Sequence, residues 1–204
     1  NSMKEISKNI SKNQIIIFPT TNSGYGIGEK GKFCTEESEL KPISSYGKQK
    51  VELEKIYLDK NSSVSLRLAT VFGPSPRMRT DLLVNNFVLK AIKDKCVVLF
   101  EENFSRNYIH IEDVCRAFIF SLDNFDKMKN QAFNVGLSSA NLTKKELCEE
   151  IQKKIEFEII ISSIGKDPDK RDYIVSNEKI EKLGWKPIKN IQNGIEELIK
   201  LYNL

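Results

Sequence analysis

The sequence predicts an α/β protein with a largely parallel sheet, and three observations predict it. Short apolar segments rich in β-branched residues recur along the chain, and segments with helical periodicity follow them. The composition is typical of a globular protein, because 40% of the residues are hydrophobic and 29% are charged. The length of 204 residues corresponds to one domain or one and a half, at about 150 residues each.

Each expected element has a local justification. The apolar run at residues 14–19 shows no alternation, which suits a strand covered on both faces. Ser44-Ser45 and Asp81 offer N-caps for the helices that follow them, and residues 143–146 form a capping-box sequence. The Gly-Pro-Ser-Pro segment at 73–76 ends the second strand. In chain order, we expect strands at 14–19, 63–72, 96–100, 108–111, 132–136 and 157–163, and helices at 3–9, 46–59, 81–95, 112–122, 143–151, 178–183 and 195–202.

Composition and charge exclude several classes of function. The longest aliphatic or aromatic runs, such as residues 15–18, are far too short to cross a bilayer. A net charge of +4 is spread along the chain and forms no basic block, so neither nucleic acid nor a membrane is an expected partner. His110 is the only histidine, which removes Ser-His and Cys-His nucleophiles and most metal sites. We expect structural roles for His110 and Trp185, and no metal.

The cysteines and the first residues indicate the cellular compartment of the protein and the extent of the chain. The four cysteines lie tens of residues apart, so no C-x-x-C pair exists, and we expect buried free thiols in a reducing compartment. Residues 1–13 are polar without an apolar core, so we expect no signal peptide and a cytoplasmic protein. The chain opens on Asn-Ser rather than Met, and we expect it to be the remainder of a longer polypeptide.

Gly26, Gly28 and Gly31 match the G-x-G-x-x-G spacing of a dinucleotide fingerprint after a strand. A pyrophosphate site needs the third glycine to open a helix, whereas the residues from Lys32 to Pro42 lack helical periodicity. We therefore expect a flexible turn region beside a site, not a fingerprint.

Tyr46 and Lys50 are four residues apart on a predicted helix, so their side chains leave the same face one turn apart. A tyrosine with its ordinary pKa of about 10 is a poor base at neutral pH, and a nearby ammonium favours the phenolate. Chance alone supplies roughly one such pair among 6 tyrosines and 26 lysines, so the spacing by itself is weak evidence for a site. Thr21 strengthens it, because it lies at the carboxyl end of the preceding strand, where α/β sheets place ligands.

Arginine usage indicates an anionic ligand. Only six arginines accompany the 26 lysines, and four of them fall in loops or at element ends: Arg77, Arg79, Arg106 and Arg171. A planar guanidinium grips a diphosphate better than a point charge does, although ordinary surface salt bridges remain the alternative for each.

Several ordered motifs together resemble a known family. Thr21 lies four residues before Tyr25-Gly26 and twenty-five before the Tyr46 of Y-x-x-x-K. Further matches are L-R-L-A-T-V-F-G-P at 66–74, R-N-Y-I-H-I-E-D at 106–113 and L-G-W-K-P at 183–187. The chain resembles the extended short-chain dehydrogenase/reductase family, specifically the NAD-dependent sugar-nucleotide epimerases and dehydratases of the UDP-glucose 4-epimerase type.

The resemblance implies the C-terminal portion of a Rossmann-like parallel sheet plus a smaller mixed α/β substrate-binding domain. Residues 1–73 and 107–136 would be the remainder of the NAD-binding Rossmann domain, and residues 74–106 and 137–204 the sugar-nucleotide-binding domain. The family's glycine-rich NAD turn has no counterpart before Asn1, so we expect an uncovered sheet edge and poor NAD binding by this chain alone. The resemblance also implies a homodimer whose interface contains the helix at 46–59.

The resemblance also implies roles for individual residues. Tyr46 would be the acid and base at the sugar C4 hydroxyl, Lys50 would hold the cofactor ribose and lower the tyrosine pKa, and Thr21 would orient the sugar oxygen. The implied cofactor-binding residues are Thr20, Tyr46, Lys50 and Val71. The substrate-binding residues that the resemblance implies are Thr21, Thr70, Asp81, Leu82, Arg106 and Arg171. Arg77 and Arg79 are added to this set from the arginine usage alone.

The expected outcome of the reaction follows from the positions at which this sequence departs from the pattern of the family. Asn22 and Ser23 stand where the 4,6-dehydratases have Asp-Glu, and neither is an acid or base of suitable pKa. The Glu of the decarboxylases is also missing there, and Thr70 replaces the family's substrate-binding Asn. We therefore predict an NAD-dependent nucleotide-sugar epimerase that works by hydride transfer at C4 through a 4-keto intermediate. The alternatives are a reductase, dehydratase or decarboxylase of the same family, or a truncated, non-catalytic sugar-nucleotide-binding module.

Overall fold

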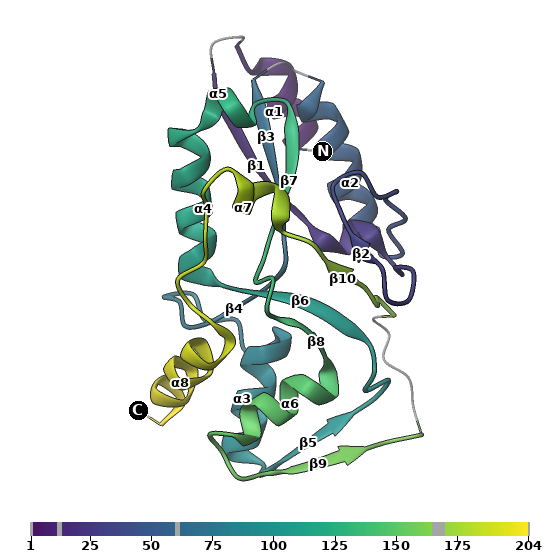
Figure 1. Cartoon of the computed structure of the whole chain (residues 1–204), viewed down its shortest axis with the longest axis vertical. Coiled ribbons are helices and arrows are strands. Elements are labelled where there is room, and N and C mark those ends of the chain that lie inside the picture. Colours follow the sequence, from purple (N-terminus) through teal and green to yellow (C-terminus); the bar gives the residue numbers. More distant parts are fainter. Residues whose placement is uncertain (1, 12–13, 60–61, 165–169, 204) are drawn as a thin grey trace.

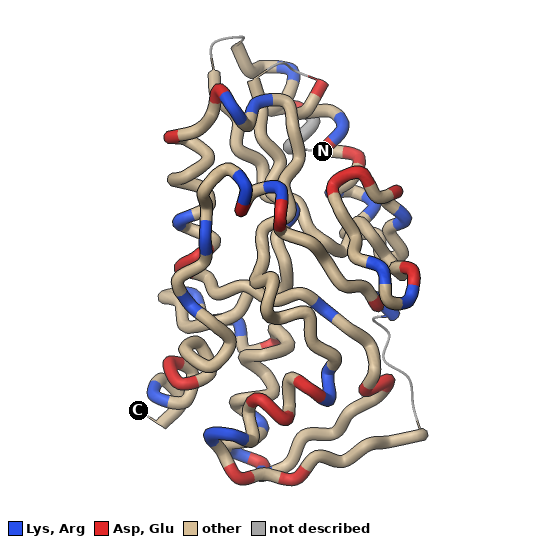
Figure 2. Tube along the Cα trace, viewed as in Figure 1, with Lys and Arg blue, Asp and Glu red and all other residues tan. Residues whose placement is uncertain are grey.

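The computed structural model describes residues 2–11, 14–59, 62–164 and 170–203 of the chain. Two regions follow one another along the long axis of the molecule (Figure 1). The three-stranded parallel sheet lies with its helices and the N-terminus in one half, and the C-terminus lies in the other half. Charged residues of both signs are interspersed along the trace (Figure 2), as the absence of a basic block in the sequence predicts.

A three-stranded parallel sheet organises the first region. Its order is β1 (Ile16–Thr21), β3 (Ser63–Leu68), β7 (Gln131–Val135), and Thr21 lies opposite Leu68. Helix α2 (Ser45–Leu58) lies on one side of this sheet and helix α4 (Ile111–Asp123) on the other (Figure 1). Because the strands are parallel, their carboxyl ends meet at one edge, and Thr21 is at that edge.

The second region combines a mixed sheet with a two-stranded ribbon. The sheet has the order β4 (Thr70–Phe72), β6 (Ser105–His110), β8 (Asn141–Thr143), and the ribbon pairs β5 (Cys96–Leu99) with β9 (Glu158–Ile161) in parallel. Its core lies among these strands and the helices α3 (Leu83–Lys93), α6 (Lys144–Gln152) and α8 (Ile191–Tyr202). The expectation of one strand over residues 63–72 is wrong, because the chain leaves the first sheet at Ala69 and enters the second at Thr70.

Short elements complete the fold. They are α1 (Ser2–Asn9), the 3-10 turn η1 (Asn22–Tyr25), β2 (Phe33–Cys34), α5 (Phe125–Met128), β10 (Ile174–Val175) and α7 (Glu178–Lys182). Strand β10 pairs with β2 in parallel, and Asp172, two residues before β10, accepts a hydrogen bond from the Ser105 amide at 2.8 Å. The Asp172 carbonyl also accepts from the Gly28 amide at 2.7 Å. This segment therefore joins the two regions.

Helix caps confirm some expectations and correct others. The Ser44 hydroxyl accepts from the Gly47 amide and caps α2, and Thr143 with Glu146 forms the predicted capping box. The N-cap of α3 is Leu82, which makes no side-chain cap bond, so the expected cap by Asp81 is wrong. Helix α8 begins earlier than expected because Asn190 supplies its own capping box.

A buried ion pair joins α2 to the parallel sheet. Glu54 of α2 and Arg67 of β3 are 2.7 Å apart, and their side chains are only 5% and 7% exposed. The hydroxyls of Thr20 and Ser65 donate to the same carboxylate at 2.9 and 2.6 Å, and Arg67 Nη1 donates to the Tyr25 hydroxyl at 3.0 Å. One network thus connects β1, η1, α2 and β3.

The charges in this network stabilise each other. Burial alone would raise the pKa of Glu54, but the hydrogen bonds and charge of Arg67, with the hydroxyls of Ser65 and Thr20, hold that pKa below its ordinary value. Burial lowers the pKa of Arg67, and the contacts with Glu54 and Tyr25 outweigh this and raise it. Both groups are therefore charged at neutral pH.

The remaining sequence expectations are mixed. All four cysteines are free thiols; Cys34 and Cys148 are buried, but Cys115 is exposed, so the expectation of four buried thiols is wrong. Burial raises the pKa of Cys148 to about 12.

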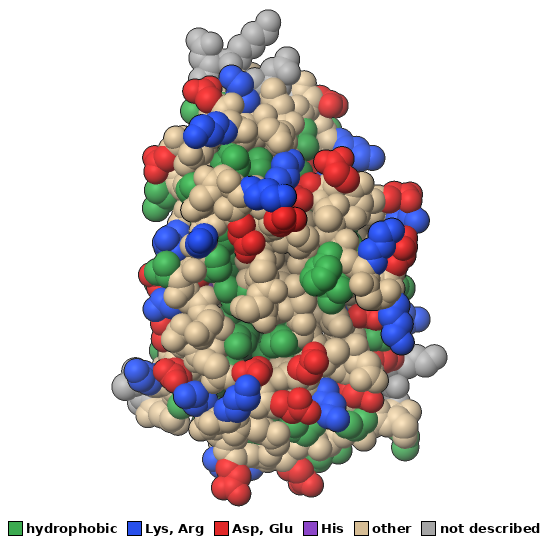
Figure 3. Space-filling model, in the orientation of Figure 1, with side chains coloured by type: hydrophobic (Ala, Val, Ile, Leu, Met, Phe, Trp, Pro, Cys, Tyr) green, Lys and Arg blue, Asp and Glu red, His purple; other side chains and the backbone are tan. Residues whose placement is uncertain are grey.

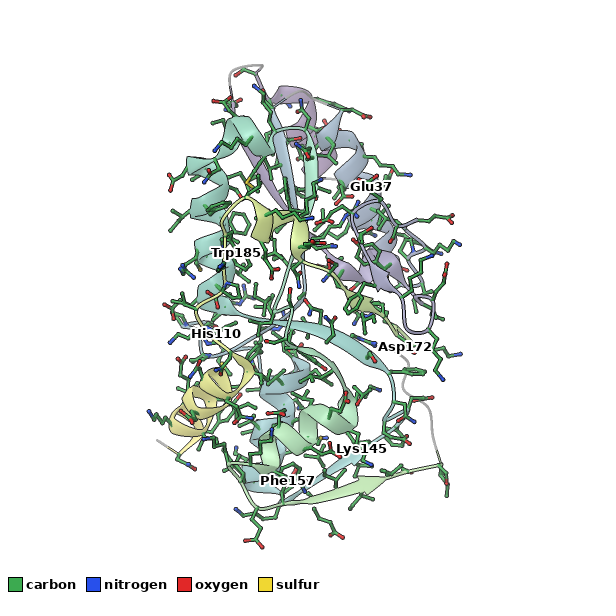
Figure 4. The ribbon with its side chains drawn as sticks, in the orientation of Figure 1. Glu37, His110, Lys145, Phe157, Asp172 and Trp185 are labelled. Carbon is green, nitrogen blue, oxygen red and sulfur yellow. The ribbon has the colours of Figure 1, made fainter. Side chains whose placement is uncertain are left out.

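Trp185 is buried beside α4, as expected (Figure 4). In the described ranges, every helix is too short or too polar to pass through a bilayer.

We predict that Arg67→Ala lowers the free energy of unfolding by about 3–5 kcal/mol, because it leaves the Glu54 carboxylate buried without its counter-charge. Urea denaturation measures this change. The control is Lys182→Ala, which removes an exposed ion pair with Glu178 and costs less than about 1 kcal/mol. Equal losses in the two variants would contradict the role of the buried pair.

We also predict a pH signature for Glu54. A carboxylate whose pKa is depressed by folding stabilises the protein above its unfolded pKa of about 4.3, and this stabilisation disappears as the pH falls through the folded pKa. The unfolding free energies of the wild type and Glu54→Gln should therefore differ most above about pH 5 and converge in acid. A difference that stays constant as the solution is acidified would refute the prediction.

Candidate active site

The carboxyl end of β1 runs directly into η1. Thr21 is the N-cap of this turn: its Oγ1 accepts from the Ser23 amide at 3.1 Å and donates to Ser23 Oγ at 2.9 Å. The turn is buried against the start of α2, where a Cβ added at Gly47 would lie 3.2 Å from the Ser23 carbonyl oxygen. The absence of a side chain at Gly47 therefore lets α2 begin beside Thr21.

Tyr46 and Lys50 lie together on the first turns of α2, as their spacing predicts. Lys50 Nζ is 5.9 Å from the centre of the Tyr46 ring and 4.9 Å from the centre of the Phe18 ring. The ammonium donates to the Pro19 carbonyl of β1 at 2.9 Å. Tyr46 is 56% exposed, so its phenol can meet a ligand.

The pKa of Tyr46 depends on a different cation from the expected one. Partial burial raises the pKa of the Tyr46 phenol, and the Arg171 guanidinium offsets part of the rise. Burial lowers the pKa of Lys50. The expectation that Lys50 lowers the tyrosine pKa is corrected here, because the Lys50 ammonium is held at the Pro19 carbonyl and Arg171 is the cation that acts on the phenol.

Arg171 brings the segment before β10 to this site. Its Nη1 donates to Ser23 Oγ, the same oxygen that accepts from Thr21. Arg171, Ser23 and Thr21 therefore form a continuous hydrogen-bonded chain beside Tyr46.

Asn22 carries a second polar group next to Thr21. Its side chain is 1% exposed, and neither its Oδ1 nor its Nδ2 has a hydrogen-bond partner among the residues that the structure describes. A buried amide without partners is uncommon in folded proteins. From the sequence, Asn22 is notable only because it is neither an acid nor a base. Nothing in the sequence indicates that its amide is buried without partners.

The predicted anion-binding residues are distributed over two places. Arg79 and Asp81 form a bidentate ion pair at 2.7 and 2.6 Å on the exposed segment before α3, which also carries Arg77 and Leu82. The hydrogen bond from Arg79 holds the pKa of Asp81 at about 2. Asp81 is therefore engaged by Arg79, which explains why it does not cap the helix.

Arg106 lies nearer to η1. It is buried in β6, its Nη1 donates to the Ser105 carbonyl at 2.8 Å, and its guanidinium lies 5.6 Å from the centre of the Tyr173 ring. Tyr173 in turn packs edge-on against Tyr25 of η1, with ring centres 6.2 Å apart. Thr70 and Val71 are partly buried in β4, opposite Tyr108 and Ile109.

Thr20 serves the network below the site. Its side chain is 5% exposed, and its hydroxyl donates to Glu54. The hydroxyl therefore has a structural role, and the cofactor-binding role expected of Thr20 stays a prediction. Residues that the sequence analysis missed lie in the same network: the Tyr25 hydroxyl donates to Asn134 Oδ1 at 2.7 Å, and burial raises the pKa of Tyr25 to about 12. The signal that could have found the network is Glu54, a charged residue on the sheet-facing side of α2.

Two further motifs behave as expected. His110 is 2% exposed; its Nδ1 accepts from the Glu112 amide at 3.3 Å and its Nε2 lies 3.1 Å from the Glu197 carboxylate, which fixes it as a structural residue. Gly26, Gly28 and Gly31 are followed by β2, not by a helix, so they do not form a dinucleotide fingerprint.

Two curated proteins are similar to nearly the whole chain. The chain is 24% identical over 98% of its length to UDP-glucuronate 4-epimerase 4 of Arabidopsis thaliana and covers 51% of that protein. It is 29% identical over 95% of its length to the dTDP-4-dehydro-6-deoxyglucose reductase of Escherichia coli and covers 63% of it. The chain therefore spans between half and two thirds of the length of these relatives.

A solved structure shares the fold. The UDP-glucuronic acid 4-epimerase of Bacillus cereus, in complex with UDP-glucuronic acid and NAD, superposes with a TM-score of 0.77 at 22% identity, over 98% of this chain and 66% of that one. The chain thus has the predicted fold, the C-terminal portion of a Rossmann-like sheet with a smaller mixed α/β part. The model of the NAD dependent epimerase/dehydratase family matches residues 3–136, and the chain belongs to this family.

Proposed function

We propose that this chain is the catalytic and substrate-binding part of an NAD-dependent nucleotide-sugar 4-epimerase. The observation that carries the proposal is the gathering of Thr21, Tyr46, Lys50 and Arg171 at the carboxyl end of β1. Family membership supports it, as do the 4-epimerases among the relatives.

The proposed division of labour follows the two regions, except that β4 and most of β6, which belong to the sheet of the second region, fall in the NAD-binding part. Residues 1–73 and 107–136 belong to the NAD-binding domain, because they contain the parallel sheet with α2 and α4. Residues 74–106 and 137–204 bind the sugar nucleotide, and they contain α3, α6, α8 and the β5–β9 ribbon. The site lies where segments of both divisions meet, at Ser23 and Arg171.

The residues at the site fit NAD in part. Lys50 donates one hydrogen bond, to Pro19, and an ammonium has three donors, so two are available for ribose hydroxyls. Tyr46 is exposed beside it, and Val71 is partly exposed in β4. When bound, NAD supplies the oxidant that takes up the hydrogen and electron pair of the sugar C4 and later returns them.

The chemistry of this chain is acid–base catalysis at the C4 oxygen. Tyr46 accepts the proton of the C4 hydroxyl while that carbon is oxidised to a ketone, and it returns the proton when the ketone is reduced on its opposite face. Thr21 donates its hydroxyl hydrogen to the same oxygen in place of Ser23. Arg171 favours the phenolate that the first step requires.

Arginine side chains hold the diphosphate in this proposal. Arg77, Arg79, Arg106 and Arg171 supply the guanidinium groups, and Arg79 exchanges its ion pair with Asp81 for the ligand. The backbone amides of Asp81 and Leu82 at the start of α3 suit a phosphate oxygen, and Thr70 contacts the sugar.

Epimerisation is preferred over the other outcomes because Asn22 and Ser23 offer no acid or base for dehydration. Reduction is the second candidate, since the Escherichia coli relative is named a reductase. We propose a homodimer through α2, by resemblance, and a cytoplasmic setting, which four free thiols support.

The test of this function incubates the protein with NAD and a panel of nucleotide sugars. We expect an isomerised sugar without net NADH. Tyr46→Phe should lower turnover by about 10²–10⁴-fold while sugar-nucleotide binding is retained. The control is Lys48→Ala, an exposed substitution on the same helix. Full activity of Tyr46→Phe would remove the phenol from the mechanism. Stoichiometric NADH with a net oxidised sugar would contradict epimerisation, and NADH consumption with a keto sugar would favour the reductase.

A second prediction concerns the cation at the phenol. Arg171→Ala should raise the pKa of Tyr46, because the guanidinium lowers it, whereas Arg171→Lys should retain most of the effect. Carbon-13 NMR of labelled tyrosine rings measures the titration, and Tyr46→Phe assigns the signal. Arg116→Ala, on α4, serves as the control. An unchanged Tyr46 titration in Arg171→Ala would contradict the assignment.

A further inference from the structure

Residues 73–82 form the segment between β4 and α3 and carry Arg77, Arg79 and Asp81; we call it the arginine loop. The start of this loop, at Gly73, and Arg79 in its second half are bound to one side chain, that of Asn85 in the first turn of α3. We propose that Asn85 is a positioning residue that fixes the arginine loop in the conformation that receives the substrate diphosphate. The inference rests on the proposed function only for the identity of that ligand.

The hydrogen bonds of Asn85 span the loop. Asn85 Oδ1 accepts from the Gly73 amide at 3.1 Å, and Asn85 Nδ2 donates to the Arg79 carbonyl at 3.0 Å. One amide group thus ties together two residues that are six positions apart in the sequence. Because Asn85 is 1% exposed, water cannot replace either bond without opening the structure.

The two anchored residues differ in how firmly other contacts hold them. Gly73 has a φ of +108°, and a Cβ there would lie 2.5 Å from Nε2 of the buried His110, so the packing around this residue is tight. Arg79 is on the exposed side, where its side chain pairs with Asp81. The bond from Asn85 Nδ2 therefore transfers the fixed position of the Gly73 end to Arg79.

Contacts with the C-terminal helix α8 fix the position of Asn85. Its backbone carbonyl accepts from the Tyr202 hydroxyl at 3.3 Å, and α3 packs against α8 in the core of the second region. Burial raises the pKa of Tyr202, so the phenol retains the proton that it donates. The C-terminal helix thereby supports the side chain that supports the loop.

The alternative is that Asn85 only satisfies buried polar groups and that its loss would weaken the whole fold equally. The neighbouring Asn86 separates the two explanations. Asn86 Nδ2 donates to the Thr80 carbonyl at 3.2 Å, but this bond is on the exposed side of the helix, where water can replace it. Asn86→Ala is therefore a matched control: it has the same residue type, helix and target loop.

Trypsin provides a direct measurement, because it cleaves after Arg77 and Arg79 within the loop. In the intact chain we expect Asn85→Ala to be cleaved at these two sites about tenfold faster than the wild type, and Asn86→Ala less than about twofold faster. Cleavage elsewhere in the same digest is the internal reference for a general loss of stability. Equal cleavage of the loop in all three proteins, or acceleration at every site alike in Asn85→Ala, would overturn the proposal.

Hydrogen exchange in the wild type decides the matter if Asn85→Ala does not fold. We expect the Gly73 amide to be protected together with the amides of α3, while the exposed loop around Arg77 exchanges fast. A Gly73 amide that exchanges as fast as those loop amides would refute the positioning role.

UDP serves as the probe for the ligand. We expect UDP to protect the wild-type loop from trypsin and to be needed at about tenfold higher concentration for the same protection of Asn85→Ala. A wild-type loop that UDP does not protect would count against the proposed nucleotide site, whereas the cleavage rates without UDP would still decide the role of Asn85. Loosening of the loop with unchanged UDP affinity would show that Asn85 does not set the binding conformation.

Discussion

The carboxylate of Glu54 lies buried between α2 and the parallel sheet, where the Arg67 guanidinium and the hydroxyls of Thr20 and Ser65 hold it. A buried charge with these partners permits little movement, because each lost contact leaves an unsatisfied group in a medium of low polarity. Tyr25 extends the same network into η1. These polar contacts connect the strand that ends in Thr21 to the helix that carries Tyr46. The relative position of Thr21 and Tyr46 therefore depends on them.

A second set of contacts brings the other region of the molecule to this place. Asp172, labelled in Figure 4, bonds to the Ser105 amide and to the Gly28 amide, and the neighbouring Arg171 reaches Ser23. On the face drawn in Figure 3, hydrophobic side chains form small groups separated by charged ones. Hydrogen bonds therefore join the regions around the site, together with the apolar cluster of Tyr25, Cys34, Tyr173 and Val175.

Much of this arrangement could be predicted from local sequence. Ser44 indicated the start of α2, and the spacing of Tyr46 and Lys50 placed both on one face. The break at Ala69 could not be predicted, since no glycine or proline interrupts residues 63–72 and only tertiary pairing divides them. Likewise, the action of Arg171 on the phenol depends on a contact between residues that are far apart in the sequence.

The central claim is that the Glu54 network holds η1 and the start of α2 in place. Hydrogen exchange of wild type and Glu54→Gln, followed by mass spectrometry on peptides covering residues 19–27 and 44–49, tests it most directly. If the network holds the site, these peptides lose protection in the variant while peptides from β5 and β9 exchange as in the wild type. Unchanged exchange in residues 19–27 and 44–49, or a uniform loss across the chain, would contradict the claim.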